Sequence, residues 1–271
     1  MAHKLKDLSE AGALVQDGDL LALGGNLMHR IPAALVRELA RQRRRGLEVV
    51  KTAGAYDIDL LAAAGCLRGV HAGYVGFEAE FGLAPNYRKS VEEGRIKAFE
   101  NACATVIAGL RAAAYGIPFQ PVGGLWGSDL PAQRGFQKMK SPYGEEEVYV
   151  IPAIRPDWTL IHVQAADPEG NARIAGTLFE DILMTRAAKG VILSAETIVS
   201  SEDLERTPEQ NLIPGFLVSA VVHTPGGAHP GSCFGHYDVD PRALADYLAR
   251  SQRDLTAYLE EQDRVPARFA P

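Results

Sequence analysis

Short apolar runs alternate with segments of helical periodicity along most of this chain, and this alternation constrains the fold more than any other feature. The apolar runs of strand length are Leu20–Leu23, Leu47–Thr52, Val70–Tyr74, Thr159–Ala165, Gly190–Ser194 and Leu217–His223. The helical segments are Ile31–Arg45, Ile58–Ala64, Ala102–Ala114 and Pro241–Leu259. This order predicts an α/β fold, in which an open and mostly parallel sheet carries helices on both faces.

The predicted elements are expected to form one domain over residues 1–271. A chain of 271 residues with 46% hydrophobic content is long enough to bury a full core. The segment at about 118–142 is rich in glycine and proline, and we expect it to be an irregular excursion from that domain. Long irregular segments in compact domains are usually functional or mobile.

The charge balance and the N-terminal sequence bear on partners and location. The net charge is −6, which argues against a nucleic-acid partner. The first residues, MAHKLKDLSEAG, lack the apolar centre of a signal peptide, and no apolar run is long enough to span a bilayer. We therefore expect a cytoplasmic protein with neither a nucleic-acid nor a membrane partner.

A strand, a glycine pair and a helix follow one another near the N-terminus, as they do in phosphate-binding loops. However, Gly24-Gly25-Asn26 matches neither the P-loop pattern nor the three-glycine dinucleotide motif. By itself this stretch is explained by a tight strand-to-helix turn. Alternatively, the glycines let a ligand approach the backbone at the start of a helix.

Four potential metal ligands lie close together in the C-terminal third. The segment HTPGGAHPGSCFGH contains His223, His229, Cys233 and His236. Their spacing matches no zinc finger and no helical H-E-x-x-H site, and the segment is rich in glycine and proline. We favour a glycine-rich loop beside a pocket or interface, and we predict no metal site.

Two further segments contain candidate polar site residues. Glu100 and Asn101 directly precede an apolar helix, where both residue types are common helix starts. A carboxylate at this position also suits a general base or a nucleophile if it faces a cleft. Ser128, in the GSD stretch of the excursion, is interpreted as a turn residue or a polar pocket contact.

Taken together, five segments resemble those of a known family. They are VQDGDLLALGGNLMHRIPAALVREL, GYVGFEAEFGLAPNYRKSVEEG, FENACATVIAGLRAAAYGIPFQPV, ADPEGNARIAG and VVHTPGGAHPGSCFGHYDVD, in this order. They resemble the A (alpha) subunits of family I CoA-transferases, particularly that of glutaconate CoA-transferase. The resemblance covers nearly the whole chain and implies the α/β sandwich shared by CoA-transferases and sugar-phosphate isomerases.

The resemblance also implies a site. In this family the glycine turn helps to shape the acyl and thioester pocket between the A and B subunits. Gly24, Gly25 and Asn26 would then bind substrate and supply amide donors for the charge that develops on the thioester oxygen. Asn101 and Ser128 are the other expected substrate contacts. A side chain at Gly25 is predicted to cut activity while leaving the fold intact.

The nucleophile of the family is implied to lie elsewhere. Family I transferases attack acyl-CoA with a glutamate in a Ser-Glu-Asn-Gly-type motif of the B subunit, and these 271 residues contain no such motif. The resemblance therefore implies a B (beta) partner chain. It also implies acyl-CoA and carboxylic acid substrates, the acid being a short or medium one such as the dicarboxylate glutaconate. Coenzyme A is expected as a substrate, with no permanently bound cofactor.

Two alternatives stay open. In a related branch, the ring-opening CoA hydrolases of steroid breakdown, a glutamate of the A (alpha) chain takes part in catalysis, and Glu100 corresponds to it here. The other alternative is a non-catalytic acyl-CoA-binding protein that kept the fold without the chemistry.

Overall fold

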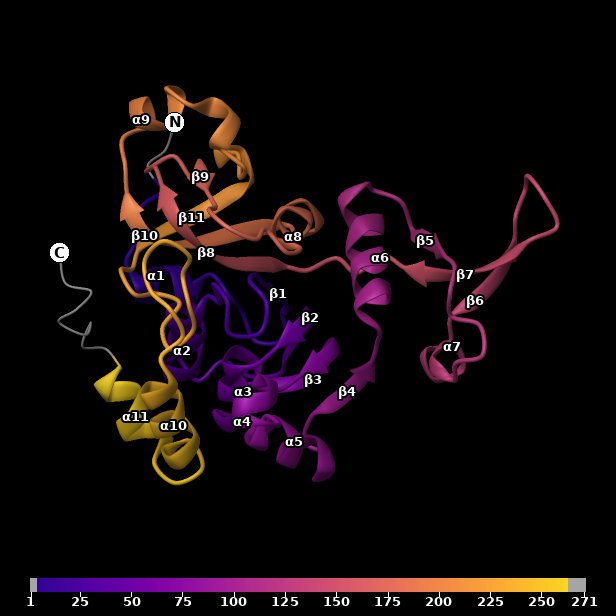
Figure 1. The fold of residues 1–271 in the computed structure, drawn as a ribbon, viewed down its shortest axis with the longest axis horizontal. Coiled ribbons are helices and arrows are strands. Elements are labelled where there is room, and N and C mark those ends of the chain that lie inside the picture. The colour runs from indigo at the N-terminus through magenta and orange to yellow at the C-terminus, as the bar shows by residue number, and fades with distance from the viewer. Residues whose placement is uncertain (1–3, 263–271) are drawn as a thin grey trace.

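A central sheet with seven parallel strands organises the computed structural model, which describes residues 4–262 (Figure 1). Across the sheet the strands are β11 (Val218–His223), β10 (Gly190–Ile198), β8 (Trp158–Ala166), β1 (Leu20–Leu23), β2 (Leu47–Gly54), β3 (Leu67–Val75) and β4 (Lys97–Glu100). A short strand, β9 (Ala172–Arg173), pairs antiparallel with β8. The predicted mostly parallel α/β sheet is therefore confirmed.

Helices cover both faces of this sheet. In β1, Leu21 and Leu23 belong to one core and Ala22 to another, because successive side chains of a strand point to opposite faces. The first face is covered by α1 (Leu8–Ala13), α2 (Ala33–Arg41), α3 (Tyr56–Ala63), α10 (Pro241–Arg250) and α11 (Leu255–Glu261). The second is covered by α6 (Cys103–Ala114) and α8 (Asp181–Ala187).

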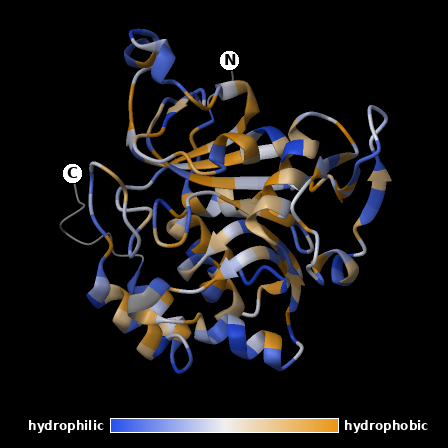
Figure 2. Cartoon of the chain, turned by 45° about the vertical axis from the view of Figure 1, so that its right-hand side comes forward, coloured by the Kyte–Doolittle hydropathy of each residue, from blue (hydrophilic) through white to orange (hydrophobic). Residues whose placement is uncertain are grey.

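Further helices lie in the connections. They include α4 (Glu78–Phe81), α5 (Pro85–Glu92) and α9 (Ser201–Glu205). Figure 2 shows hydrophobic residues concentrated along the central strands. Within residues 4–262, no helix combines the length and the apolar character needed to cross a bilayer.

The predicted irregular excursion at 118–142 is in fact ordered. It contains β5 (Phe119–Val122), α7 (Leu130–Arg134) and β6 (Gln137–Lys140), and with β7 (Glu147–Pro152) it forms a three-stranded antiparallel sheet. This arm projects from the body of the molecule beyond α6 (Figure 1). Pro121 lies within β5, and proline is tolerated there because β5 is an edge strand. The prediction of an irregular segment, which rested on its prolines and glycines, was therefore wrong.

Two predicted helices differ from the structure for local reasons. The segment Pro241–Leu259 is two helices rather than one, and the Asp254 side chain accepts a hydrogen bond from the Ala257 amide at the start of the second. The segment Ile31–Arg45 is helical only from Ala33 to Arg41. Beyond it, Arg43 and Gly46 have φ angles of 54° and 63°, which a right-handed helix does not allow.

Candidate substrate-binding site

The order of the strands marks one place where ligands are expected. β1 lies between β2 and β8, and the chain runs from β1 to β4 on one side before it crosses to β8, β10 and β11 on the other. In open α/β sheets, ligands bind outside the carboxyl ends of the strands where the strand order reverses in this way. The carboxyl ends of β1 and β8 are therefore the first place to look for a site.

A cavity of about 790 Å³ lies at this switch point. Ligand pockets usually measure about 300–1,000 Å³, so its size is suitable. Its walls come from the turn after β1, the segment between β9 and α8, and the loop after β11. The lining residues are His29, Arg30, Ala175, Gly176, Thr177, Phe179, Ser232, Phe234, Tyr237, Asp238 and Val239.

A buried ion pair braces two of these walls. Arg30 is only 3% exposed, and its guanidinium pairs with the Asp181 carboxylate at the start of α8. It also donates to the main-chain oxygens of His162 and Thr177, at 3.1 and 3.0 Å. The other carboxylate oxygen of Asp181 accepts the amide of Gly25 at 2.8 Å. Asp181 thus links the glycine turn and the cavity wall to the same helix.

The predicted glycine turn adjoins the cavity-lining residue His29 but supplies no lining residue itself, and its amides already have acceptors within the chain. The Gly24 amide donates to a main-chain oxygen of β8 at 2.9 Å, Gly25 donates to Asp181, and Asn26 donates to the His29 oxygen at 3.0 Å. A substrate oxygen would have to replace one of these acceptors. The roles of Gly24, Gly25 and Asn26 in binding substrate therefore stay predictions.

The Asn26 side chain joins a short polar chain at the carboxyl ends of β1 and β2. Its amide lies 3.3 Å from the Thr52 hydroxyl, which donates to Glu180 at 2.7 Å. Thr52 is buried, whereas Glu180 is half-buried. These hydrogen bonds connect the Glu180 carboxylate to the predicted glycine turn. The sequence analysis did not identify Glu180 as a candidate.

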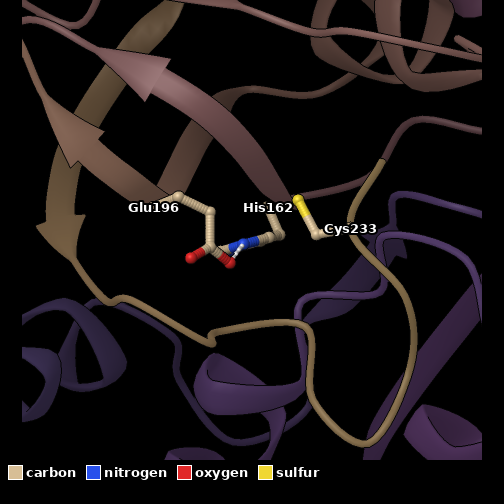
Figure 3. Close-up of side chains that lie close together, drawn as sticks. All are labelled: His162, Glu196 and Cys233. Carbon is tan, nitrogen blue, oxygen red and sulfur yellow. Dashed lines mark hydrogen bonds and ion pairs between the residues drawn. The ribbon is translucent and has the colours of Figure 1, made fainter. Parts of the chain in front are cut away.

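A second buried network, part of which Figure 3 shows, reaches the cavity through Tyr237. His162 contacts the Glu196 carboxylate through Nε2 at 2.7 Å and the Ser194 hydroxyl through Nδ1 at 2.9 Å. Glu196 also accepts from the hydroxyl of Tyr237, a cavity-lining residue, at 2.5 Å and from the Gly226 amide at 2.8 Å. Glu196 therefore anchors the loop after β11 to the central strands.

The residues considered for a metal do not gather in the structure. Within residues 4–262, the tail histidines form no three-ligand group with Cys233; His229 instead pairs with Asp240 at 3.0 Å. Cys233 lies with His162 and Glu196, all three ligand atoms being within 4.8 Å of one another (Figure 3). Burial raises the pKa of the Cys233 thiol to about 12, which keeps it protonated. We interpret His162 and Glu196 as a hydrogen-bonded brace that packs beside the buried thiol.

The buried histidine predicts an acid sensitivity of folding. Burial lowers the pKa of His162 and outweighs the opposing effect of Glu196. The unfolded chain, with a histidine pKa of about 6.5, then binds a proton that the folded chain does not. We expect the free energy of unfolding to be unaffected by this group above pH 6.5 and to fall as the pH drops below it.

Urea unfolding at a series of pH values measures this effect. The His162→Gln variant should show a shallower loss of stability below pH 6.5, whereas His223→Gln, at an exposed histidine, should keep the full slope. If the free energy of unfolding fell equally steeply with pH in the two variants, His162 would not be the source of the acid sensitivity.

Glu100 lies away from the switch point. It ends β4, three strands from β1, which corresponds to roughly 14 Å across the sheet. There it lines a separate cavity of about 170 Å³ with Tyr74 and Tyr87. Burial and then the Glu100 carboxylate raise the pKa of Tyr87 to about 12. The structure therefore separates Glu100 from the glycine turn.

Asn101 and Ser128 make local contacts. The Asn101 amide donates to the Phe99 oxygen at 2.7 Å, and its oxygen accepts from the Thr105 hydroxyl at 3.0 Å, as suits the start of α6. Ser128 is exposed in the arm and accepts the Leu130 amide at 3.2 Å. Neither residue lines the switch-point cavity, and their substrate contacts stay predictions.

Sequence reasoning missed the residues that brace the cavity. Arg30 and Asp181 are 151 positions apart, so no local pattern connects them. For His162 a signal did exist, because it is a polar residue inside the apolar run Thr159–Ala165. Its pairing with Glu196 depends on the register of β8 and β10, which only the structure reveals.

Comparison with known proteins reveals a consistent set of relatives. The family model described as Coenzyme A transferase matches residues 5–224. The A (alpha) chain of glutaconate CoA-transferase from Acidaminococcus fermentans is 33% identical over 95% of this chain and 87% of its own length. The crystal structure of the glutaconate coenzyme A-transferase from that organism superposes with a TM-score of 0.89 and 31% identity, covering 98% of this chain and 94% of that one.

Two further relatives add contrast. The cholesterol ring-cleaving hydrolase IpdA subunit of Mycobacterium tuberculosis is 33% identical over 91% of this chain and 88% of its own length. An uncharacterised protein of Archaeoglobus fulgidus is 36% identical over 96% of this chain, which spans only 59% of the length of that relative.

Proposed function

The chain belongs to the coenzyme A transferase family, and we propose that it is the A (alpha) chain of a heteromeric enzyme that moves CoA from an acyl-CoA to a carboxylic acid. The observation that carries this proposal is the cavity at the switch point of a sheet that superposes on glutaconate coenzyme A-transferase over nearly its full length. The cavity and the adjoining glycine turn would form this chain's side of an acyl pocket that the B subunit completes. The B subunit would supply the reactive glutamate.

The proposed reaction divides the work between the two chains. The partner's glutamate carboxylate attacks the thioester carbonyl, the carbon–sulfur bond breaks, and an acyl–glutamyl anhydride and CoA thiolate form. The thiolate then attacks the glutamyl carbonyl, which releases the donor acid and leaves a glutamyl–CoA thioester. The acceptor carboxylate reverses these steps and leaves as the new acyl-CoA.

The residues of this chain would orient the acyl group and keep water away. Phe179 and Phe234 provide apolar wall, and the Arg30–Asp181 pair fixes the segments that carry the wall. Exclusion of water protects both the anhydride and the thioester from hydrolysis. Positioning of this kind gives the partner's nucleophile a fixed target.

Assays of the chain with and without a partner test this proposal. The purified chain, incubated with acyl-CoA and a panel of acceptor acids, should give no turnover, whereas the chain co-expressed with a B-type subunit should transfer CoA. Borohydride reduction after incubation with acyl-CoA should modify a peptide of the partner, because it attacks the enzyme-bound thioester. Robust CoA transfer by the isolated chain would refute the proposal that the B subunit supplies the reactive glutamate. Binding of acyl-CoA by the complex without CoA transfer would favour the non-catalytic alternative.

A CoA-ester hydrolase is the second candidate, and two observations favour it. Glu100 lines its own cavity with Tyr74 and Tyr87, and the chain has a relative named as a ring-cleaving hydrolase subunit. In that case Glu100 would serve as the base or nucleophile of this chain. Such an enzyme would need no acceptor acid.

The Glu100→Gln variant separates the two candidates. Glutamine keeps the shape of the side chain and removes its charge. For a transferase with its nucleophile on the partner, we expect reduced but measurable activity of the complex. For a hydrolase that depends on Glu100, the loss should reach about 10²–10⁴-fold. Glu93→Gln, at an exposed carboxylate outside both cavities, is the matched control and should leave kcat unchanged.

A further inference from the structure

One peptide group of the glycine turn is held at both ends by buried ion pairs. The carbonyl oxygen of Gly24 accepts a hydrogen bond from the Lys51 ammonium group at 2.9 Å. The amide of Gly25, in the same peptide group, donates to the Asp181 carboxylate at 2.8 Å. Lys51 pairs with Asp57 at 2.6 Å, and Asp181 belongs to the buried pair described above. The Gly24–Gly25 peptide group therefore cannot rotate unless one of these contacts breaks.

The pair that holds the carbonyl end lies in the interior. The Lys51 and Asp57 side chains are 0% exposed. Asp57 also accepts the amides of Ala55 and Ile58 through its other oxygen, at 3.1 and 2.9 Å, which fixes it at the start of α3. Apolar side chains of similar volume often stabilise a fold as well as a buried ion pair does, or better. The position that this pair gives the Gly24 carbonyl therefore explains it better than stability does.

The backbone that follows this peptide group is unusual. Gly25, Leu27 and Arg30 have φ angles of 68°, 47° and 51°, so two residues with side chains adopt a left-handed conformation. Such conformations are costly, persist only where neighbouring contacts enforce them, and cluster at functional sites. The Leu27 amide donates to the main-chain oxygen of Ala53 in β2 at 3.0 Å. Lys51 lies two residues earlier in the same strand, so β2 enforces the turn at two points.

We propose that Lys51 is a positioning residue, whose ammonium group holds the Gly24–Gly25 peptide group in the orientation in which the turn borders the acyl pocket. Its consequence for transfer rests on the proposed function, because it takes the turn as part of this chain's side of a pocket that the B subunit completes. Site groups must be held to within about 0.5 Å of the productive geometry. A turn released at one end loses this precision, and a displacement of about 1 Å can lower a rate about a hundredfold.

Two variants separate positioning from stability, because they change the two properties in opposite directions. Asp57→Asn leaves the Lys51 charge buried without its counter-ion and should lower the urea midpoint, but the amine still donates to the Gly24 oxygen. The double variant, Lys51→Met with Asp57→Asn, removes both charges. Its urea midpoint should therefore lie above that of Asp57→Asn, although the Gly24 oxygen has lost its donor.

A second double variant makes the same comparison if the methionine form does not fold. It combines Lys51→Gln with Asp57→Asn, and it also removes both charges. The glutamine nitrogen lies one atom closer to the main chain than the lysine nitrogen, so it falls short of the Gly24 oxygen. The results expected below are the same for both double variants.

Hydrogen exchange of the full chain, followed by mass spectrometry, measures the turn without any assay of transfer. In the double variant, the proteolytic peptide that contains Gly25 should exchange at least about tenfold faster than in the wild type, because the released peptide group can turn its N–H away from Asp181. In Asp57→Asn this peptide should keep nearly the wild-type rate. Exchange in β8, a buried central strand, reports on global unfolding and should follow the urea midpoints.

CoA transfer by the complex with the B subunit measures the consequence for the reaction. The double variant should lower kcat about tenfold to a hundredfold and change the KM for acyl-CoA less than about threefold, because a misplaced turn affects the transition state more than the bound substrate. Asp57→Asn should lower kcat less than about threefold, although it is the less stable protein. A purely structural role of Lys51 would instead make kcat follow stability.

The outcomes distinguish this inference from the proposed function. Faster exchange of the Gly25 peptide and a lower kcat, both in the double variant and not in Asp57→Asn, support the inference. Unchanged exchange of that peptide in the double variant overturns it, and so does a kcat that follows the urea midpoints. If the wild-type complex transfers no CoA, the proposed function fails alone, and the exchange rates of the two variants still decide whether Lys51 holds the turn.

Discussion

Replacing Asp181 by asparagine is expected to lower the free energy of unfolding by about 3–5 kcal/mol. The Arg30 and Asp181 side chains are only 4% and 0% exposed, so the change leaves the Arg30 charge buried without its counter-ion. Asparagine retains an oxygen for the Gly25 amide but directs an amide group where Arg30 needs an acceptor. Urea denaturation of the full chain measures the loss.

Two comparisons make this prediction specific. The double variant Asp181→Asn with Arg30→Met removes the stranded charge, and it should recover part of the loss. The Glu145→Gln variant breaks the exposed Lys140–Glu145 pair, which is 2.6 Å long, and should change stability little. If Asp181→Asn were as mild as Glu145→Gln, the pair would not brace the cavity.

The parts of the fold that could be predicted are those with strong local patterns. The strand Leu20–Leu23 has the predicted bounds, because its apolar residues are buried on both faces of the sheet. The strand Lys97–Glu100 was missed. It has four residues, two of them charged, and it lies at the edge of the sheet, where polar residues are tolerated.

The candidate site could be predicted only in part, for a related reason. The glycine turn has a sequence signature, and the structure places it next to the lining residue His29 but outside the cavity lining. The groups that hold it in place, Arg30 and Asp181, are brought together by the crossing from one side of the sheet to the other. Glu100 also has a local signature, but its strand position sets it three strands from the turn, which the sequence did not reveal.

Replacing Gly25 by valine is expected to destabilise the fold by at least about 3 kcal/mol, in contrast to the sequence-based expectation that the fold would stay intact. Gly25 has a φ of +68°, a conformation that a β-branched residue avoids. A Cβ atom there would also lie 2.6 Å from the carbonyl carbon of Arg30. Because the contacted atoms are main chain, they cannot move without disturbing the turn that Asp181 holds.

Alanine substitutions at Gly18 and Gly25 separate the cost of the positive φ angle from the cost of the steric overlap with the main chain. Gly18 has a φ of +87°, and an added Cβ would meet nothing within 4 Å. Gly18→Ala should therefore lower the free energy of unfolding by only about 1 kcal/mol, which is the cost of the backbone conformation. Gly25→Ala has a similar conformational cost and also meets the main chain, so its urea midpoint should fall well below that of Gly18→Ala. Equal midpoints would show that the turn relaxes around a side chain. In that case any loss of activity at Gly25 would report on the ligand, and the sequence-based expectation would be restored.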